Sequence, residues 1–499
     1  MKTLLRQFFY AASLILIGIL CTVVLAYKVL LDHFPDLKPW HQVELNDDFH
    51  ADAGVSSLSE YLAVEDLAFS ELDRKILDHI KPQDRFRFNR FSRGSLSDPA
   101  AVQPNWNRTF VFNTAKPHGG ALLLHGLSDS PYSMRSVGEF LQHNGWLVIG
   151  MRLPEHGTAP GSLRNFNRND ARAVTRIGMR YLRQQLGNER PLVIVGFSTG
   201  AALATDYALA AHADTNLPRV DGLVFMSPAF AVTPIAALAV WQARIGELFG
   251  IDKLAWQIVT PEFDPYKYNS FAVRAGDQIY RLTEEVNQQL EAIGQGKAID
   301  GFPPTLVFQS VADATVQPSA VVTRLLDRLT ANGSALVLYD VNRRSDIEPL
   351  YIANVGAWVQ DKLSTPTKYK VTLLTNRRTG GKQVSAVTRN PDASETVDEK
   401  LDLAWPLSVY AISHVAIPFP PDDPVYGADN NADSKQLHIG GIELRGENDV
   451  LAIPGPMLTR LRYNPFYSYQ SRRVGEFMQQ IIANQSRSGA GRAARGTVN

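Results

Sequence analysis

The feature that most constrains the fold is a series of short, uninterrupted apolar runs that alternate with helix-like stretches. Strands that are apolar on both faces, and that alternate with helices, are typical of a parallel sheet covered on both sides. Helical periodicity marks the stretches between the runs, as in residues 134–143 and 170–186. The apolar runs occupy residues 121–124, 147–151, 191–195, 222–226 and 305–308. The sequence therefore predicts an α/β fold with a mostly parallel sheet.

The rest of the 499-residue chain predicts further segments around this alternation. Residues 28–105 are expected to contain a connector at 28–56, then a helix at 58–80 and a strand at 86–91. The first half of a core is expected at residues 106–228, and a helix-rich insertion follows at 229–300. The second half of the core is expected at 301–484 and contains a second insertion at 344–406. Residues 485–499 are expected to be a disordered tail. Residues 369–375 and 383–388 predict a hairpin within the second insertion.

Charge and cysteine content exclude several classes of function. Fifty Lys and Arg residues balance fifty Asp and Glu residues, so a general nucleic-acid binder, which needs a basic excess, is disfavoured. The single cysteine, Cys21, excludes an intramolecular disulfide and a CxxC redox pair. The sequence contains no HExxH, no phosphate-binding P-loop and no strand-borne GxGxxG. We therefore expect no metal, no cofactor and no nucleic-acid partner.

Residues 8–27 form a twenty-residue stretch without one charged side chain. A helix of that length can cross a hydrocarbon layer of roughly 30 Å. Lys2 and Arg6 precede it, which favours a cytoplasmic N-terminus and an extracytoplasmic body, periplasmic in a Gram-negative bacterium. A cleaved signal peptide ending at residues 24–26 is the alternative. Because the apolar stretch exceeds the usual signal-peptide core, we expect residues 1–27 to be a retained, single-pass membrane anchor.

The strongest functional signal is Gly196-Phe197-Ser198-Thr199-Gly200, which directly follows a buried strand and precedes a helical run. In this context the serine of a G-x-S-x-G motif lies on a strained turn that exposes its hydroxyl. The two glycines let the backbone pass close to itself, and the amides at the start of the helix face developing negative charge. We therefore predict that Ser198 is a catalytic nucleophile.

A second motif, His125-Gly126-Leu127, ends a predicted strand well upstream of the serine. A backbone amide at this point is expected to form part of an oxyanion hole. The amides of Leu127 and Thr199 would then hold the oxyanion of a tetrahedral intermediate. His125 precedes the serine, whereas the general base follows it in this architecture. We expect His125 to brace the loop and not to act as the base.

Three histidines follow Ser198 and are candidates for the general base. His212 lies fourteen residues later on the same predicted helix, about 20 Å away, and cannot reach the serine. His414 follows the apolar run 407–412, which predicts a strand that would deliver it to the catalytic loops. His438, in a stretch rich in Gly and Asp, lacks such a strand and is the second candidate.

The acid that orients the base is also expected after the serine. Asp313 follows the predicted strand that begins at residue 305, at the edge of the sheet where catalytic loops gather. A carboxylate there accepts the imidazole N–H, fixes its tautomer and stabilises the imidazolium. Asp340, which ends the strand-like residues 335–339, is the alternative. We predict a triad of Ser198, Asp313 and His414.

At these residues the chain resembles the α/β-hydrolase superfamily, and within it the branch of monoacylglycerol lipases, carboxylesterases and serine aminopeptidase-like proteins. The resemblance covers about residues 118–320 and rests on LLLHGLSDSPYSM, RLPEHGTAPG and GFSTG. Glu155 stands where the family usually has the first glycine of Pro-Gly-His-Gly. The resemblance implies an α/β-hydrolase fold in which residues 229–300 form a cap over the acyl site.

The C-terminal part departs from the family pattern. In the family the base follows the strand after the acid, but here residues 335–341 lead into a segment without histidine, and His414 comes 101 positions after Asp313. Either residues 344–406 loop out and return the chain to the sheet, or the topology differs. If His414 is the base, we expect this insertion to be peripheral and residues 407–412 to complete the sheet.

These observations predict a membrane-anchored serine hydrolase that cleaves carboxylic esters through an acyl-enzyme. Apolar residues at 230–241, with Leu248, Phe249 and Trp256, favour lipid-like substrates of the monoacylglycerol or lysophospholipid type; packing within the insertion itself is the alternative explanation. A peptidase or thioesterase with the same triad, or a non-catalytic binding module of the same fold, are the other hypotheses.

Overall fold

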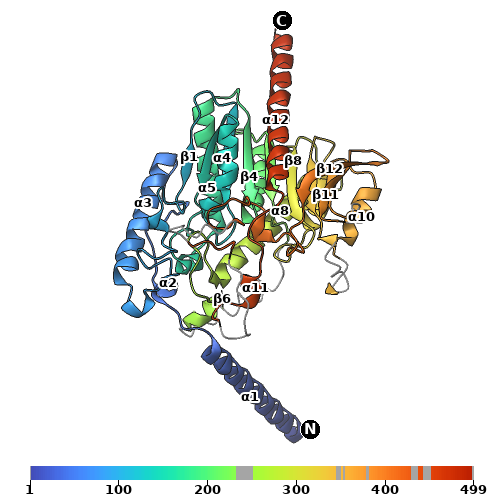
Figure 1. Ribbon diagram of the computed structural model, residues 1–499. Helices are drawn as coiled ribbons and strands as arrows, with labels where there is room; N and C mark the ends of the chain where they lie inside the picture. Colours follow the sequence, from blue (N-terminus) through green and yellow to red (C-terminus); the bar gives the residue numbers. More distant parts are fainter. Residues whose placement is uncertain are drawn as a thin grey trace.

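A central sheet runs through the protein, for which the computed structural model describes residues 2–231, 251–343, 350–351, 355–377, 381–428, 437–441 and 451–496. These residues contribute ten strands to it, in the order β1-β3-β2-β4-β5-β8-β9-β10-β11-β12 (Figure 1). Their bounds are β1 Phe110–Phe112, β2 Gly119–Leu124, β3 Trp146–Met151, β4 Leu192–Phe197, β5 Gly222–Met226, β8 Thr305–Ser310, β9 Ala335–Tyr339, β10 Lys370–Thr375, β11 Gln383–Arg389 and β12 Thr396–Ala404. A separate pair is formed by β6 (Trp256–Ile258) and β7 (Phe271–Ala272).

The middle of this sheet is parallel. Every neighbouring pair from β3 to β10 runs in the same direction, whereas β1, β11 and β12 are antiparallel to their neighbours at the two edges. All five apolar runs are strands of the parallel part, with bounds that differ from the predicted ones by a few residues. The predicted α/β architecture is confirmed.

Helices cover both faces because successive residues of a strand point to opposite sides. Leu122 and Leu124 of β2 pack on the face covered by α5 and α6, and Leu123 packs on the face covered by α4 and α12. The helices are α1 Lys2–His33, α2 Pro39–Gln42, α3 Leu58–Lys75, α4 Arg135–His143, α5 Arg168–Leu186, α6 Thr199–Ala213, α8 Val273–Gly294, α9 Ala320–Arg324, α10 Ala357–Ser364, α11 Gly455–Leu458 and α12 Tyr467–Gly496.

The predicted strand at residues 86–91 is wrong. These residues form turns, in which Asn89 Nδ2 donates to the Asp84 carbonyl and Asn89 Oδ1 accepts from the Phe91 amide. Phe86 and Phe88 remain about 40% exposed, at 42% and 43%, while Phe91 is buried. The alternation of apolar and polar residues is therefore present without a neighbouring strand to pair with, and local side-chain hydrogen bonds satisfy the backbone instead.

The second insertion belongs to the sheet, which corrects the expectation that residues 344–406 are peripheral. Strand β10 pairs in parallel with β9, and the predicted hairpin of β10 and β11 is present and is extended by β12. Residues 407–412 are a loop and not the expected strand; their contact with the sheet is a single bridge between Val341 and Ala411. Of the two topologies considered, the one that differs from the family pattern is the one present.

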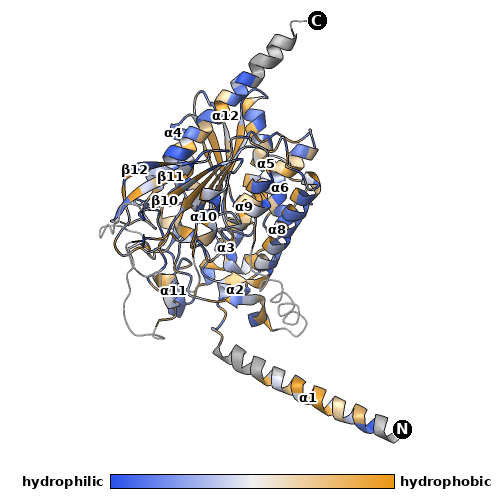
Figure 2. Ribbon diagram, turned by 90° about the vertical axis from the view of Figure 1, so that its right-hand side faces the viewer, coloured by the Kyte–Doolittle hydropathy of each residue, from blue (hydrophilic) through white to orange (hydrophobic). Residues whose placement is uncertain are grey.

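The two ends of the chain extend away from the body (Figure 1). The C-terminal helix α12 continues as far as Gly496, through residues for which the sequence predicts a disordered tail. At the other end α1 projects from the body, and its described apolar side chains are exposed, with Phe8 at 70% and Leu16 at 71% (Figure 2). Within the described residues, however, no helix reaches the length and apolarity needed to cross a membrane, so the predicted span is not supported.

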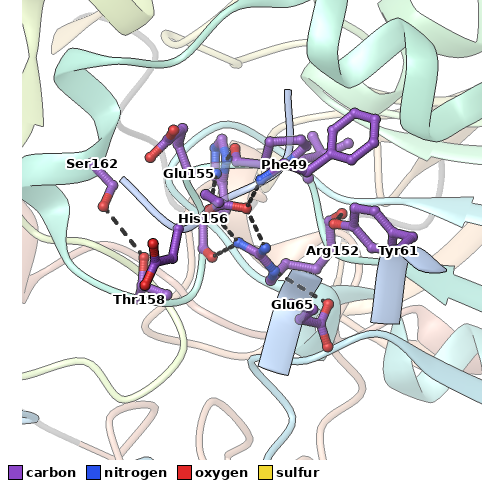
Figure 3. A network of polar contacts seen from close by, with 12 residues as sticks. Phe49, Tyr61, Glu65, Arg152, Glu155, His156, Thr158 and Ser162 are labelled. Atoms are coloured by element: carbon purple, nitrogen blue, oxygen red, sulfur yellow. Dashed lines mark hydrogen bonds and ion pairs between the residues drawn. The ribbon is translucent and has the colours of Figure 1, made fainter. Parts of the chain in front are cut away.

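A buried ionic network attaches the N-terminal segment to the core (Figure 3). Arg152, directly after β3, is fully buried and binds Asp48 through both terminal nitrogens, at 2.9 and 2.6 Å. Its Nε donates to Glu65 of α3 at 3.2 Å, and Tyr61 of the same helix donates to the Arg152 carbonyl at 2.6 Å. The amide of Glu155 also donates to Asp48, so residues 152–155 are held from the N-terminal side.

We predict that Asp48→Asn lowers the free energy of unfolding by about 3–5 kcal/mol, because it removes the carboxylate bound to both terminal nitrogens of a buried guanidinium and leaves the Glu65 contact at Nε. Denaturant unfolding measures the change. Asp66→Asn is the matched control: Asp66 pairs with Arg108 but is 73% exposed, and exposed pairs contribute about 0–1 kcal/mol. Equal losses in the two variants would contradict the structural role of the network.

Candidate active site

Ser198 lies on a strained turn between β4 and α6. Its backbone has φ 51° and ψ −113°, a conformation that non-glycine residues rarely adopt. The turn is held on the β5 side, where the Ser198 amide donates to the Met226 carbonyl at 3.0 Å and its carbonyl accepts from the Ala229 amide at 3.1 Å. The strand, turn and helix around the G-x-S-x-G motif are thus present as predicted.

The two glycines of the motif are required by the close passage of the backbone. A Cβ on Gly196 would lie 2.5 Å from the Ala201 amide nitrogen, and a Cβ on Gly200 would overlap the Leu124 carbonyl. Neither obstacle is a flexible side chain, so neither can move away. Glycine at both positions therefore allows α6 to start directly above the carboxyl end of β2.

The amides predicted for the oxyanion hole lie on two adjacent elements. Thr199 is the first residue of α6, and Leu127 lies in the loop after β2, the strand next to β4. Neither amide N–H has a hydrogen-bond acceptor among the described residues. The first amides of a helix have no partner within it, and the helix dipole makes such a position favourable for negative charge.

His125 braces this loop. Its Nε2 accepts from the Leu153 amide at 3.0 Å, so the proton resides on Nδ1, which bonds the Gly126 carbonyl at 2.8 Å. Burial, together with the neighbouring His156, lowers the pKa of His125 well below its usual value. A neutral imidazole with both nitrogens engaged is not available as a base, in agreement with the interpretation of the sequence.

The structure brings Asp313 and His414 together although 101 positions separate them. Asp313 follows β8, and its Oδ2 lies 2.8 Å from His414 Nδ1. His414 is 4% exposed, and its ring centroid lies 5.2 Å from that of Phe197, the residue directly before Ser198. The imidazole is therefore located beside the turn that carries the serine, with its Nδ1 side held by a carboxylate.

Hydrogen bonds prepare the Asp313 carboxylate for this contact. Its Oδ1 accepts from the amides of Thr315 and Val316, at 2.8 and 3.1 Å, and its Oδ2 also accepts from Gln309 Nε2 at 3.0 Å. Burial acts to raise the pKa of Asp313, but the charge and hydrogen bond of His414, with the two amides, lower it below the usual value. The carboxylate consequently stays ionised at neutral pH.

The alternative residues are engaged elsewhere. Asp340 binds Arg343 at 2.7 Å and accepts from Thr375 Oγ1 at 2.6 Å, so it is part of the β9 to β10 connection. His438 Nδ1 accepts from the Gly441 amide at 3.2 Å. His212 is in the last turn of α6, far along the helix from Ser198. Of the two acids considered, Asp313 is the one bonded to His414.

Part of the first insertion packs on the oxyanion loop. Lys267 Nζ lies 2.6 Å from Asp129 Oδ1, and the Tyr268 amide donates to the Ser128 carbonyl at 2.8 Å. Residues 232–250, which include most of the predicted apolar cap surface, lie outside the described residues. Of the apolar residues in the insertion that are described, Phe230 and Trp256 are each 1% exposed and belong to the core.

The structure also places near this site two residues that the sequence motifs did not identify. Arg460 and Arg462, in the segment after α11, line a cavity together with Lys267. The sequence contains a weak signal for them, an Arg-x-Arg pair that comes after the predicted base. Nothing in that spacing indicates which part of the sheet the pair approaches, so only the structure relates it to the site.

Comparison with known proteins agrees with this geometry. Residues 115–343 match the family model described as serine aminopeptidase, S33. A thermostable monoacylglycerol lipase from Bacillus sp. (strain H-257) is 28% identical over 200 residues, which is 40% of this chain and 72% of that protein. Similar solved structures include a monoacylglycerol lipase of Paleococcus ferrophilus (21% identity, 46% of this chain and 88% of that chain, TM-score 0.35) and a carboxyl esterase of Bacillus coagulans (15% identity, 51% and 93%, TM-score 0.35).

The parallel sheet, the strained serine between β4 and α6 and the match to the S33 model define the class of protein. Over residues 115–343 the chain has the α/β-hydrolase fold and is similar to that superfamily, as its motifs suggested. It is a hydrolase of the lipase- and esterase-like kind.

We predict that Gly200→Ala lowers the free energy of unfolding by on the order of 3 kcal/mol and removes activity, because the added methyl displaces α6 from β2. Thermal unfolding and a hydrolase assay measure both effects. Gly294→Ala, at the end of α8, is the control, since its Cβ would make an ordinary 3.5 Å contact with Ile299. A Gly200→Ala protein as stable and active as the control would contradict the close-passage argument.

Proposed function

We propose that this hydrolase cleaves carboxylic esters of lipid-like molecules, of the monoacylglycerol or lysophospholipid type, through a triad of Ser198, His414 and Asp313. The observation that carries the proposal is the 2.8 Å contact between His414 and Asp313 beside the strained Ser198 turn. The similarity to a monoacylglycerol lipase supports ester chemistry on a lipid-like substrate.

The proposed reaction follows from the positions of these groups. Ser198 Oγ attacks the ester carbonyl carbon while His414 Nε2 takes its proton, since Nδ1 is held by Asp313. The carbonyl oxygen becomes an oxyanion that the amides of Leu127 and Thr199 stabilise. His414 then returns the proton to the leaving alcohol. Water, activated by the same imidazole, releases the acid and restores the serine.

We expect Ser198→Ala to fold normally and to lose both ester hydrolysis and covalent labelling by a fluorophosphonate, since the oxyanion hole alone cannot form an acyl-enzyme. His414→Ala is expected to lower turnover by several orders of magnitude, because triad residues act as a unit. Peptide mapping of the labelled protein and a panel of ester, thioester and peptide substrates measure these effects.

His438→Ala is the matched control for the base and should leave turnover nearly unchanged. Labelling that persists in Ser198→Ala would move the nucleophile to another residue. If His438→Ala were as damaging as His414→Ala, the assignment of the base would be wrong. A preference for peptides over esters would retain the triad and replace the proposed reaction by that of an aminopeptidase-like enzyme.

We further propose that residues 8–27 anchor the protein in a membrane, with the catalytic body on the extracytoplasmic side. The support is the uncharged stretch itself and the positive residues Lys2 and Arg6 before it. An anchor of this kind would keep the enzyme beside a bilayer that contains lipid esters.

A reporter enzyme that works only outside the cytoplasm should be active when fused after residue 40, because the positive residues retain the N-terminus inside. The same reporter on a chain that lacks residues 1–27 should be inactive. Reporter activity in the cytoplasm would refute the orientation. A mature N-terminus at Tyr27 would show that the segment is a cleaved signal peptide and not an anchor.

A further inference from the structure

A cavity of about 440 Å³ adjoins the proposed catalytic groups. Its lining includes Ser128, directly after the oxyanion residue Leu127, and Val415, directly after His414. A narrower cavity shares Val415 and Arg462 with it and reaches Phe197, directly before Ser198. The larger cavity therefore lies next to the region in which an ester carbonyl would be attacked. Ile258 of β6 and Met457 of α11 both line the cavity, and the two elements are labelled in the lower part of Figure 1.

Three cations line this cavity. Lys267, between β6 and β7, is paired with Asp129 at 2.6 Å. Arg460 Nη2 donates to Thr315 Oγ1 at 2.7 Å, and Arg462 Nη2 donates to the Met457 carbonyl at 2.9 Å. A guanidinium has five N–H donors, so among the described residues these bonds occupy a small part of the capacity of each arginine.

The carboxylates near the cavity leave Arg460 without an ion-pair partner among the described residues. Asp129 is engaged by Lys267, and Asp313 by His414. Asp264 forms a long ion pair with Arg462, 4.0 Å from its Oδ2 to Arg462 Nη1, while its Oδ1 accepts from Tyr426 Oη at 2.5 Å. Burial raises the pKa of Asp264, while the charge of Arg462 acts to lower it. The arginine side chains are thus a positive region next to the proposed reacting centre.

We infer that this cavity binds an anionic group, a phosphate or a carboxylate, carried by the ester substrate close to the scissile bond, and that Arg460 and Arg462 hold it. The inference rests on the ester hydrolysis proposed above and specifies its substrate class. Guanidinium groups match the planar, paired oxygens of such anions with two parallel hydrogen bonds. A neutral glycerol or a hydrocarbon chain would leave both charges partly desolvated without compensation.

Hydrolysis of matched short-chain esters tests this. The neutral substrate is 1-hexanoylglycerol, the phosphate substrate is 1-hexanoylglycerol 3-phosphate, and the carboxylate substrate is a hexanoyl ester of glyceric acid. We expect kcat/KM of the full-length protein to be at least tenfold higher for one of the two anionic esters than for the neutral one, because hydrogen bonds to charged groups contribute about 1.5–3 kcal/mol each. The preferred anion distinguishes phosphate from carboxylate.

Arg460→Gln and Arg462→Gln are each expected to lower the ratio of anionic to neutral kcat/KM about tenfold. Arg219→Gln is the matched control, since it removes the same charge at the amino end of β5, where Arg219 is 76% exposed. The control should leave the ratio unchanged. Raising the salt concentration should lower the ratio in the unmodified protein more than in the two variants.

Calorimetric binding of the corresponding ethers, which cannot be hydrolysed, separates this inference from the proposed function. The phosphate or carboxylate ether should bind at least tenfold more tightly than the neutral ether, and Arg462→Gln should remove the difference. Equal binding of charged and neutral ethers, or an equal effect of Arg219→Gln, would overturn the inference while leaving ester hydrolysis intact. Tight anionic binding without hydrolysis of any ester would support the anion site and refute the ester chemistry.

Discussion

The catalytic edge depends on the contact between the start of α6 and the end of β2. Strands β2 and β4 are parallel neighbours, and the chain that leaves β4 must turn back over β2 within a few residues. Gly200 makes this possible because a Cβ there would overlap the Leu124 carbonyl. The same closeness brings Thr199, at the head of the helix, next to the loop that carries Leu127. The positive φ of Ser198 is the strain that this short connection imposes.

The sequence predicted the parts of the fold that are encoded locally. Apolar runs identified the parallel strands, since strands buried on both faces need such runs, and G-x-S-x-G identified the Ser198 turn. Asp313 could be chosen because the end of a parallel strand faces the catalytic edge. Sequence patterns predicted the wrong structure where contacts with distant parts of the chain determine the conformation of a segment. Residues 86–91 alternate like a strand but pair with no strand among the described residues. Residues 407–412 form a loop in which Val409 and Ile412 are buried whereas Leu407 and Tyr410 are exposed.

His414 reaches the site by a route that no local pattern encodes. After β9 the chain adds β10, β11 and β12 to the sheet and then returns to the residues that follow β9. There the Asn342 amide donates to the Tyr410 carbonyl at 2.8 Å, and Asn342 Nδ2 donates to the Val409 carbonyl at 3.0 Å. The loop before His414 is thereby fixed at the end of β9, where the family pattern would place the loop of its base. The loop that carries His414 therefore lies at the same end of β9 as in the family pattern, although the connection that leads to it is much longer.

The same C-terminal segment joins the proposed base to the proposed anion site. Ser413 Oγ donates to the Leu461 carbonyl, which connects the residue before His414 with the residue between the two arginines. Arg460 in turn donates to Thr315, whose amide holds Asp313 Oδ1. A group bound by Arg460 would therefore contact the loop that carries the acid. Because the departure from the family pattern supplies both the proposed base and these arginines, we expect changes in this segment to alter turnover and substrate charge preference together.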